Sequence, residues 1–394
     1  MPPPLPQKTW HRLKVLLLCQ FVLSFYLALS LTTVRAIIYP QNKQLIANRT
    51  ISESNTTEFN LMWQSDATVT HHGAVATGDF NGDGLLDIAS NDNNTSKLIV
   101  YLNQGNRVFS LTQQVTSAPM VLNMEGVDID GDGDLDIATR NGAVTKILIH
   151  INDGHGNFTH QYAGDIEVIG NHDRYPVFGD ANGDGDLDIL STFDKQLKIY
   201  LNNGTGIFTE NTPTQFASYS DIEGVTWGDI NQDGRIDILF SSISNKVYLN
   251  QGNLLFSEID GGDFVTESIP SNDLILRDID LDGDLDLALG YSNNDLIVSN
   301  QIYENDGQGF FTNITAGDLA NDANRRTYNL DLGDIDGDGD LDLATANFGN
   351  PYTFKAESSQ IYRNDGGGVF TDITAGDLFD TYGHAENDSV TFVL

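Results

Sequence analysis

The feature that most constrains this 394-residue chain is a nine-residue segment that occurs six times. The copies read DFNGDGLLD (79–87), DIDGDGDLD (128–136), DANGDGDLD (180–188), DINQDGRID (229–237), DIDLDGDLD (278–286) and DIDGDGDLD (334–342). Their starts lie 49 to 56 residues apart. A repeat of this length is one supersecondary unit that buries a core only by packing against its neighbours. The sequence therefore predicts a repeat protein.

Each repeat contains four predicted strands in a fixed order. One apolar strand precedes the Asp-rich segment, a second follows it, and a third ends at an Asn-x-Gly turn, which suits a hairpin. The fourth strand is predicted to begin at a recurring Phe: Phe109, Phe158, Phe208, Phe256, Phe311 and Phe370. No long helical period follows the N-terminal apolar segment. This pattern predicts an all-β fold, a β-propeller of four-stranded blades.

The number of blades depends on the chain ends. Residues 59–63 resemble a fourth strand, residues 43–48 resemble a third, and residues 388–394 stand where a first strand would begin. We therefore expect a seven-bladed ring whose last blade is assembled from both termini and lacks one strand. A closed six-bladed ring is the alternative.

The Asp-rich segments have the side-chain pattern of a calcium loop. Ca²⁺ takes six to eight oxygen ligands in flexible geometry, and oxygens at positions 1, 3 and 5 of a tight loop surround one side of the ion. Gly at position 6 permits the bend. Position 7 varies from Leu85 to Arg235, so its backbone carbonyl is the predicted ligand. Asp at position 9 supplies the closing carboxylate.

Five residues of each loop form the predicted site, which gives up to six structural Ca²⁺ ions. Position 1 holds Asp79, Asp128, Asp180, Asp229, Asp278 and Asp334. Position 3 holds Asn81, Asp130, Asn182, Asn231, Asp280 and Asp336. Position 5 holds Asp83, Asp132, Asp184, Asp233, Asp282 and Asp338. Position 7 holds Leu85, Asp134, Asp186, Arg235, Asp284 and Asp340. Position 9 holds Asp87, Asp136, Asp188, Asp237, Asp286 and Asp342.

Charge and spacing narrow the choice of metal and partner. An EF-hand needs Glu at position 12, which is absent from all six loops, and zinc would prefer His or Cys. The net charge is −36, and 25 of the 56 acidic residues are Asp of the loops. Such a charge excludes nucleic acid or an anionic membrane surface as the main partner and favours divalent cations.

On these loops the chain resembles the FG-GAP/VCBS repeat family across residues 57–394. The resemblance implies a calcium-binding propeller similar to the head of integrin α subunits, and hence a role in cell adhesion. Val127 and Arg277 replace the Gly that precedes the first Asp elsewhere, and no Gly-Ala-Pro segment occurs, so the VCBS branch is the closer match. Integrin-like propellers recognise partners on the face opposite the calcium loops.

Candidate ligand-binding residues follow from that expectation. The stretch from the last loop Asp to the turn Asn spans 14 residues in the third repeat and 22 in the sixth. Variable connections on a rigid scaffold commonly carry binding sites. The predicted ligand residues on these connections are Arg325, Arg326, Tyr352, Phe354 and Lys355.

The N-terminus indicates an extracytoplasmic protein. Basic residues precede an apolar run over 15–34, so residues 1–36 are predicted to be a signal peptide or a signal anchor. Residues 37–56 would then be a linker and 57–394 the propeller. The single cysteine, Cys19, lies in the signal, so calcium rather than disulfides would stabilise the secreted or surface-displayed chain. Membrane contact would occur only through an uncleaved anchor.

Two function classes remain open from sequence. One is a binding or adhesion module for an extracellular protein or glycan. The other is a polysaccharide hydrolase or lyase, or its accessory domain. No Gly-x-Ser-x-Gly, His-Glu-x-x-His or phosphate-loop motif occurs, so no enzyme is expected. His150, His155 and His160 have no matching Cys or His cluster and are expected at the surface or in packing.

Overall fold

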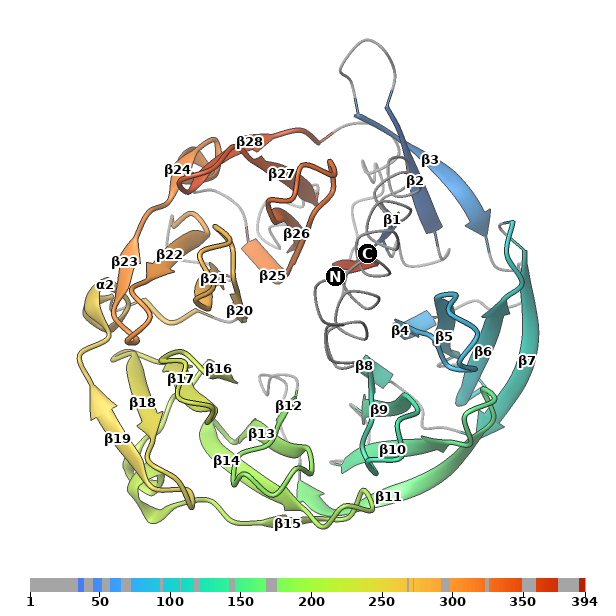
Figure 1. Cartoon of the computed structure of the whole chain (residues 1–394), viewed down its shortest axis with the longest axis horizontal. Coiled ribbons are helices and arrows are strands. Elements are labelled where there is room, and N and C mark those ends of the chain that lie inside the picture. Colours follow the sequence, from blue (N-terminus) through green and yellow to red (C-terminus); the bar gives the residue numbers. More distant parts are fainter. Residues whose placement is uncertain are drawn as a thin grey trace, which may run out of the picture.

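The fold consists of four-stranded sheets arranged around a ring (Figure 1). The computed structural model describes residues 35–38, 45–51, 57–64, 72–92, 95–106, 108–116, 121–141, 146–167, 176–267, 269–271, 273–291, 298–322, 326–348, 359–374 and 390–393. Helical segments among them are short: η1 (Thr214–Ser218), α2 (Gly262–Thr266) and η2 (Leu319–Asn321). The expected all-β propeller is confirmed.

Each repeat forms one antiparallel unit whose strands pair in sequence order. The first two units are β4 (His72–Gly78), β5 (Asp87–Asp92), β6 (Lys97–Asn103) and β7 (Phe109–Thr116), then β8 (Val121–Val127), β9 (Asp136–Asn141), β10 (Lys146–Asn152) and β11 (Phe158–Glu167). The next two are β12 (Val177–Gly179), β13 (Asp188–Phe193), β14 (Gln196–Asn202) and β15 (Phe208–Glu210), then β16 (Gly224–Gly228), β17 (Asp237–Ser241), β18 (Lys246–Asn250) and β19 (Phe256–Ile259). The last two are β20 (Asp273–Arg277), β21 (Asp286–Gly290), β22 (Gln301–Asn305) and β23 (Phe311–Asn313), then β25 (Arg326–Gly333), β26 (Asp342–Phe348), β27 (Gln360–Asn364) and β28 (Val369–Asp372). First strands lie toward the centre of the ring and fourth strands lie at its edge (Figure 1).

A further four-stranded sheet combines the two chain ends. Its strand order is β29 (Val390–Val393), β1 (Arg35–Ile38), β2 (Leu45–Ile51) and β3 (Thr57–Gln64). The expectation that this unit lacks a strand is wrong, because β1 pairs with both β2 and β29. β1 begins inside the segment predicted as a signal, and β2 lies in the predicted linker.

Neighbouring blades also pair at the outer edge of the ring. The end of β11 pairs in parallel with β15 through Gly164 and Phe208, and β24 (Ala316–Gly317) pairs in parallel with β28. Gly262 and Phe311 form an equivalent isolated bridge. Backbone hydrogen bonds therefore link consecutive blades in addition to side-chain packing.

The hydrophobic core lies between blades, and every Asp loop is anchored in it. Ile230, at position 2 of the fourth loop, is buried in the cluster between the fourth and fifth blades. Ile236, at position 8 of the same loop, packs against the cluster between the third and fourth blades. Phe80 at position 2 of the first loop and Leu135 at position 8 of the second take the equivalent places between the first two blades. The loops therefore lie at the junctions where blades meet.

One buried histidine replaces a repeated tyrosine. His150 stands where the other five repeats have Tyr101, Tyr200, Tyr248, Tyr303 and Tyr362. It is fully buried, and its ring centroid is 5.2 Å from that of His160 on the paired strand β11. Burial, reinforced by His160, lowers the pKa of His150 to about 3. The packing role expected for this residue agrees with its burial.

Folding stability is expected to fall in acid because of His150. The unfolded chain binds a proton at this residue below about pH 6.5, whereas the folded chain keeps it neutral, so stability is present above that pH and lost below it. Between about pH 7.5 and about pH 5 the wild type should lose about 2 kcal/mol more than a His150→Gln variant. Urea unfolding of both proteins in calcium checks this, and equal losses would contradict it.

No helix in the described part of the chain is long and apolar enough to cross a membrane. Of the predicted signal over residues 1–36, residues 1–34, including Cys19, lie outside the described residues.

Candidate metal centre

All six Asp loops connect the first and second strands of their blades. Because the strands of a blade run antiparallel, the loops share one face of the ring with the Asn-x-Gly turns between third and fourth strands. The hydrogen bonds between loop and turn confirm this, as where the Asn103 N–H donates to Asp87 Oδ1 at 2.7 Å. The connections between second and third strands lie on the opposite face. The predicted assignment of faces is therefore confirmed.

The position-1 and position-5 carboxylates shape each loop from within. In the first loop, the two oxygens of Asp79 accept hydrogen bonds from the N–H groups of Asp83 at 3.0 Å and Gly84 at 2.7 Å. Asp83 Oδ1 accepts the N–H of Leu85 at 2.9 Å. The same position-1 and position-5 bonds recur in the third and fourth loops. These hydrogen bonds within the protein therefore bend each loop without a bound ion.

The position-9 carboxylates are buried and hold the loop to the third strand. In every loop, Oδ2 accepts the position-2 N–H and Oδ1 accepts the N–H of the turn Asn. Burial raises the pKa to about 6 for Asp136, Asp188 and Asp286 and to about 7 for Asp237 and Asp342, against the lowering effect of these hydrogen bonds. Position 9 is thus a structural residue as well as a predicted ligand.

Three loops bring carboxylates close enough together to hold a metal ion. The groups are Asp128, Asp130 and Asp136; Asp278, Asp280 and Asp282; and Asp334, Asp336 and Asp342, with ligand oxygens within 4.8 Å of one another. These are the loops with Asp rather than Asn at position 3. Burial and the neighbouring carboxylates raise the pKa of Asp130 and Asp280. A divalent cation would relieve this repulsion.

Two buried carboxylate oxygens at predicted ligand positions have no hydrogen-bond partner among the described residues. They are Oδ1 of Asp130 and Oδ1 of Asp278. Buried polar atoms nearly always have partners, and a bound cation would supply one for each of these oxygens. The donor set consists of carboxylate, amide and carbonyl oxygens, which are the ligands Ca²⁺ prefers. The second and fifth loops therefore fit the ion that the sequence predicts.

Sequence reasoning missed the role of the Asn that ends each third strand. In five blades its side chain donates one hydrogen bond to the position-8 carbonyl of its own loop and another, at 2.8–3.3 Å, to the position-2 carbonyl of the preceding loop. We call these residues the blade-bridging asparagines: Asn152, Asn202, Asn250, Asn305 and Asn364. A signal for them was present, because this Asn recurs in every repeat while the residue after it varies.

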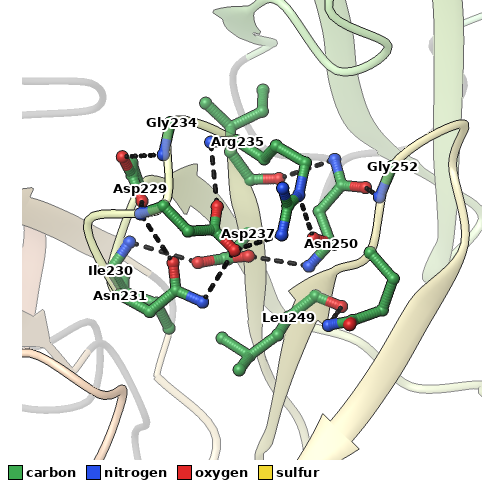
Figure 2. A network of polar contacts seen from close by, with 12 residues as sticks. Asp229, Ile230, Asn231, Gly234, Arg235, Asp237, Leu249, Asn250 and Gly252 are labelled. Atoms are coloured by element: carbon green, nitrogen blue, oxygen red, sulfur yellow. Dashed lines mark hydrogen bonds and ion pairs between the residues drawn. The ribbon is translucent and has the colours of Figure 1, made fainter.

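In four blades the position-7 side chain lies against the turn of its own blade: Asp134, Asp186, Arg235 and Asp284. The carboxylate of Asp134 is so close to Gly154 that a Cβ there would lie 2.2 Å from Oδ2. Gly154 also has φ +74°, so this turn requires glycine on both grounds. In the fourth loop, Arg235 lies across the loop toward Asn250 (Figure 2). In these four loops the side chain is directed to the turn, which leaves the backbone carbonyl as the predicted metal ligand.

The predicted ligand-binding residues are only partly placed. Arg325, Tyr352, Phe354 and Lys355 lie outside the described residues. Arg326 begins β25, and its backbone partner in the sheet is Phe348, the last residue of β26. The two connections that carry the candidates therefore start side by side, at the end of the sixth blade that lies opposite the Asp loops.

The four-stranded repeats around a ring, each with an Asp loop, define a β-propeller. The family model described as FG-GAP-like repeat matches residues 79–139, 128–191, 180–240 and 278–345, which together make up more than half of the chain. The chain belongs to the FG-GAP-like repeat family, as its resemblance indicated. No curated protein sequence matches it significantly.

Solved structures with the same fold are distant in sequence. An Agrocybe aegerita lectin, whose structure concerns recognition of non-reducing terminal N-acetylglucosamine, is 18% identical with a TM-score of 0.63, covering 92% of this chain and 95% of the lectin. A Lactobacillus plantarum protein is 12% identical and a putative 6-phosphogluconolactonase from Bacteroides uniformis is 14% identical. Both have a TM-score of 0.55, and each match covers 92% of this chain and 100% of the other protein. These likenesses show the fold.

Proposed function

We propose that this protein is a secreted or surface-displayed binding module whose propeller is stabilised by calcium. The single observation that carries the proposal is the separation of the two faces. On one face, carboxylates, turn residues and blade-bridging asparagines are engaged in holding blades together. On the other, connections of variable length leave the rigid sheets, which is the arrangement of many binding proteins.

Calcium would bind at positions 1, 3, 5 and 9 and at the position-7 carbonyl of the loops. When bound, the ion supplies positive charge that neutralises the crowded carboxylates and joins both limbs of the loop. In the second, fourth and fifth loops positions 2 and 8 pack into different inter-blade clusters, so a stiffened loop would also fix the angle between blades. The unpartnered oxygens of Asp130 and Asp278 support this role.

A glycan is the ligand class that we favour over a protein. The lectin from Agrocybe aegerita shares this architecture over nearly its whole length. The sixth-repeat connection contains Tyr352 and Phe354 beside Lys355, and aromatic rings beside polar groups suit the apolar face and hydroxyl groups of a sugar. A protein partner is the alternative, and it would leave the glycan array described below without a bound ligand.

Glycan binding is expected to require calcium and the sixth-repeat connection. On a glycan array the purified protein should bind one class of glycan in calcium and lose it in EGTA. Arg326→Ala combined with Tyr352→Ala should weaken binding at least about tenfold, because a few central residues dominate most interfaces. Ile207→Ser, an exposed change on the calcium-loop face, should leave affinity unchanged.

Three results would contradict this proposal. The array could show no glycan bound in calcium, the Ile207 variant could lose as much affinity as the double variant, or new reducing ends could appear during incubation with polysaccharide. The last result would indicate a hydrolase or lyase.

A further inference from the structure

The first and fourth loops form a natural matched pair. Both carry Asp, Asn, Asp and Asp at positions 1, 3, 5 and 9. Their internal hydrogen bonds also agree: the position-3 amide donates to Oδ2 of the position-5 carboxylate at 3.1 Å in each loop. At position 7 the first loop has Leu85 and the fourth has Arg235. They also differ at position 4, Gly82 against Gln232, so substitutions at position 7 alone isolate the effect of that residue.

Arg235 forms an ion pair inside its own loop. Its Nη2 donates to Oδ2 of Asp233, the position-5 ligand, and its Nε donates to the Asn250 carbonyl at 2.6 Å. The Arg235 backbone N–H donates a hydrogen bond to Oδ1 of Asp233 at 3.0 Å. Figure 2 shows the side chain lying over the loop toward this blade-bridging asparagine. Both oxygens of a predicted calcium ligand are thus engaged by one residue.

We propose that the Arg235 guanidinium takes the place of calcium at the fourth loop, so that this loop binds calcium more weakly than the first loop. The inference rests on the calcium binding proposed above. Arginine stays protonated at every physiological pH, so its charge repels a cation permanently. Calcium affinity in such loops follows the ligand charge. The fourth loop has three carboxylates and one guanidinium, whereas the second, fifth and sixth have five carboxylates each.

A direct consequence concerns calcium shortage. When calcium is removed, the other loops lose the charge that relieves their carboxylates, but the fourth keeps its guanidinium. The fourth loop is also joined to the fifth. The side-chain amide of Gln232 donates to Asp284 and, at 3.3 Å, to the Gly283 carbonyl. The junction between the fourth and fifth blades should therefore be the last part of the calcium loop face to loosen.

Calorimetric titration of the calcium-free protein tests the inference through two reciprocal variants. Arg235→Leu, which copies the first loop, should tighten the weakest calcium-binding step at least about tenfold. Leu85→Arg, which copies the fourth loop, should weaken one step by a similar factor. The melting temperature of Arg235→Leu should rise in saturating calcium and fall in EGTA, relative to wild type. If the substitution only disrupted the structure, the melting temperature would fall both in calcium and in EGTA.

The two proposals fail in different ways. If Arg235→Leu and Leu85→Arg both leave every calcium affinity unchanged, the charge at position 7 has no effect and this inference is wrong. If the wild type binds no calcium, the calcium role in the proposed function is wrong as well, without reference to the variants. Leu85 is exposed, so Leu85→Arg is a test that does not require repacking of the core.

Discussion

Removal of calcium is expected to lower the melting temperature of this protein by about 10 °C or more. With a dissociation constant of about 10⁻⁴ M and about 2 mM calcium, each occupied loop contributes about 2 kcal/mol to the free energy of unfolding. Several loops together approach the stability of a typical domain. The loss is large because the loops are anchored in the inter-blade clusters, and three of them contact two such clusters through positions 2 and 8. Calorimetry in calcium and in excess EGTA measures it.

Two controls separate a specific effect of calcium from a general effect of charge. Magnesium should restore little of the lost melting temperature, because it demands stricter octahedral geometry than these loops offer. Asp132→Asn should remove roughly the contribution of one loop, since it changes a position-5 ligand, which is Asp in all six loops, without altering its size. An equal melting temperature with and without EGTA would show that the loops do not depend on calcium.

The repeat pattern was sufficient to predict the blades because each strand boundary has a local cause. Phe109, Phe158, Phe208, Phe256 and Phe311 begin fourth strands as expected, and the sixth begins one residue early at Val369. The first strands end at the Asp loops, and the third strands end at the Asn-x-Gly turns. These signals are short-range, so they can be read without knowing which units touch.

Long-range features escaped the sequence analysis. Asn305 was assigned only to a turn, yet its amide reaches the Ile230 carbonyl of the preceding loop. Arg235 was a ligand through its carbonyl alone, whereas its side chain forms an ion pair with Asp233. β1 was divided between the predicted signal and the predicted linker, because it directly follows an apolar run. In each case the missing information was the spatial neighbour, which depends on how blades pack.

Asn305→Leu is expected to destabilise the protein by about 3 to 5 kcal/mol in calcium. The Asn305 side chain donates to the Ile230 carbonyl at 2.9 Å and the Leu285 carbonyl at 3.1 Å, and it accepts the Gly309 N–H at 3.0 Å. The residue is 2% exposed, so water cannot replace these partners. Leucine has a similar volume but leaves three buried polar groups unpaired, each at a cost of about 1 to 3 kcal/mol before relaxation. Urea unfolding measures the change.

Asn103→Leu provides the matched control for the bond between blades. Asn103 is equally buried and bonds to Leu86 of its own loop and to the Gly105 N–H, but no bond to another blade is present among the described residues. Its substitution should therefore cost about 1 to 2 kcal/mol less than Asn305→Leu. Equal losses would mean that the bridge to the preceding loop contributes nothing. A larger loss at Asn305 would show that this asparagine couples the fifth blade to the loop of the fourth.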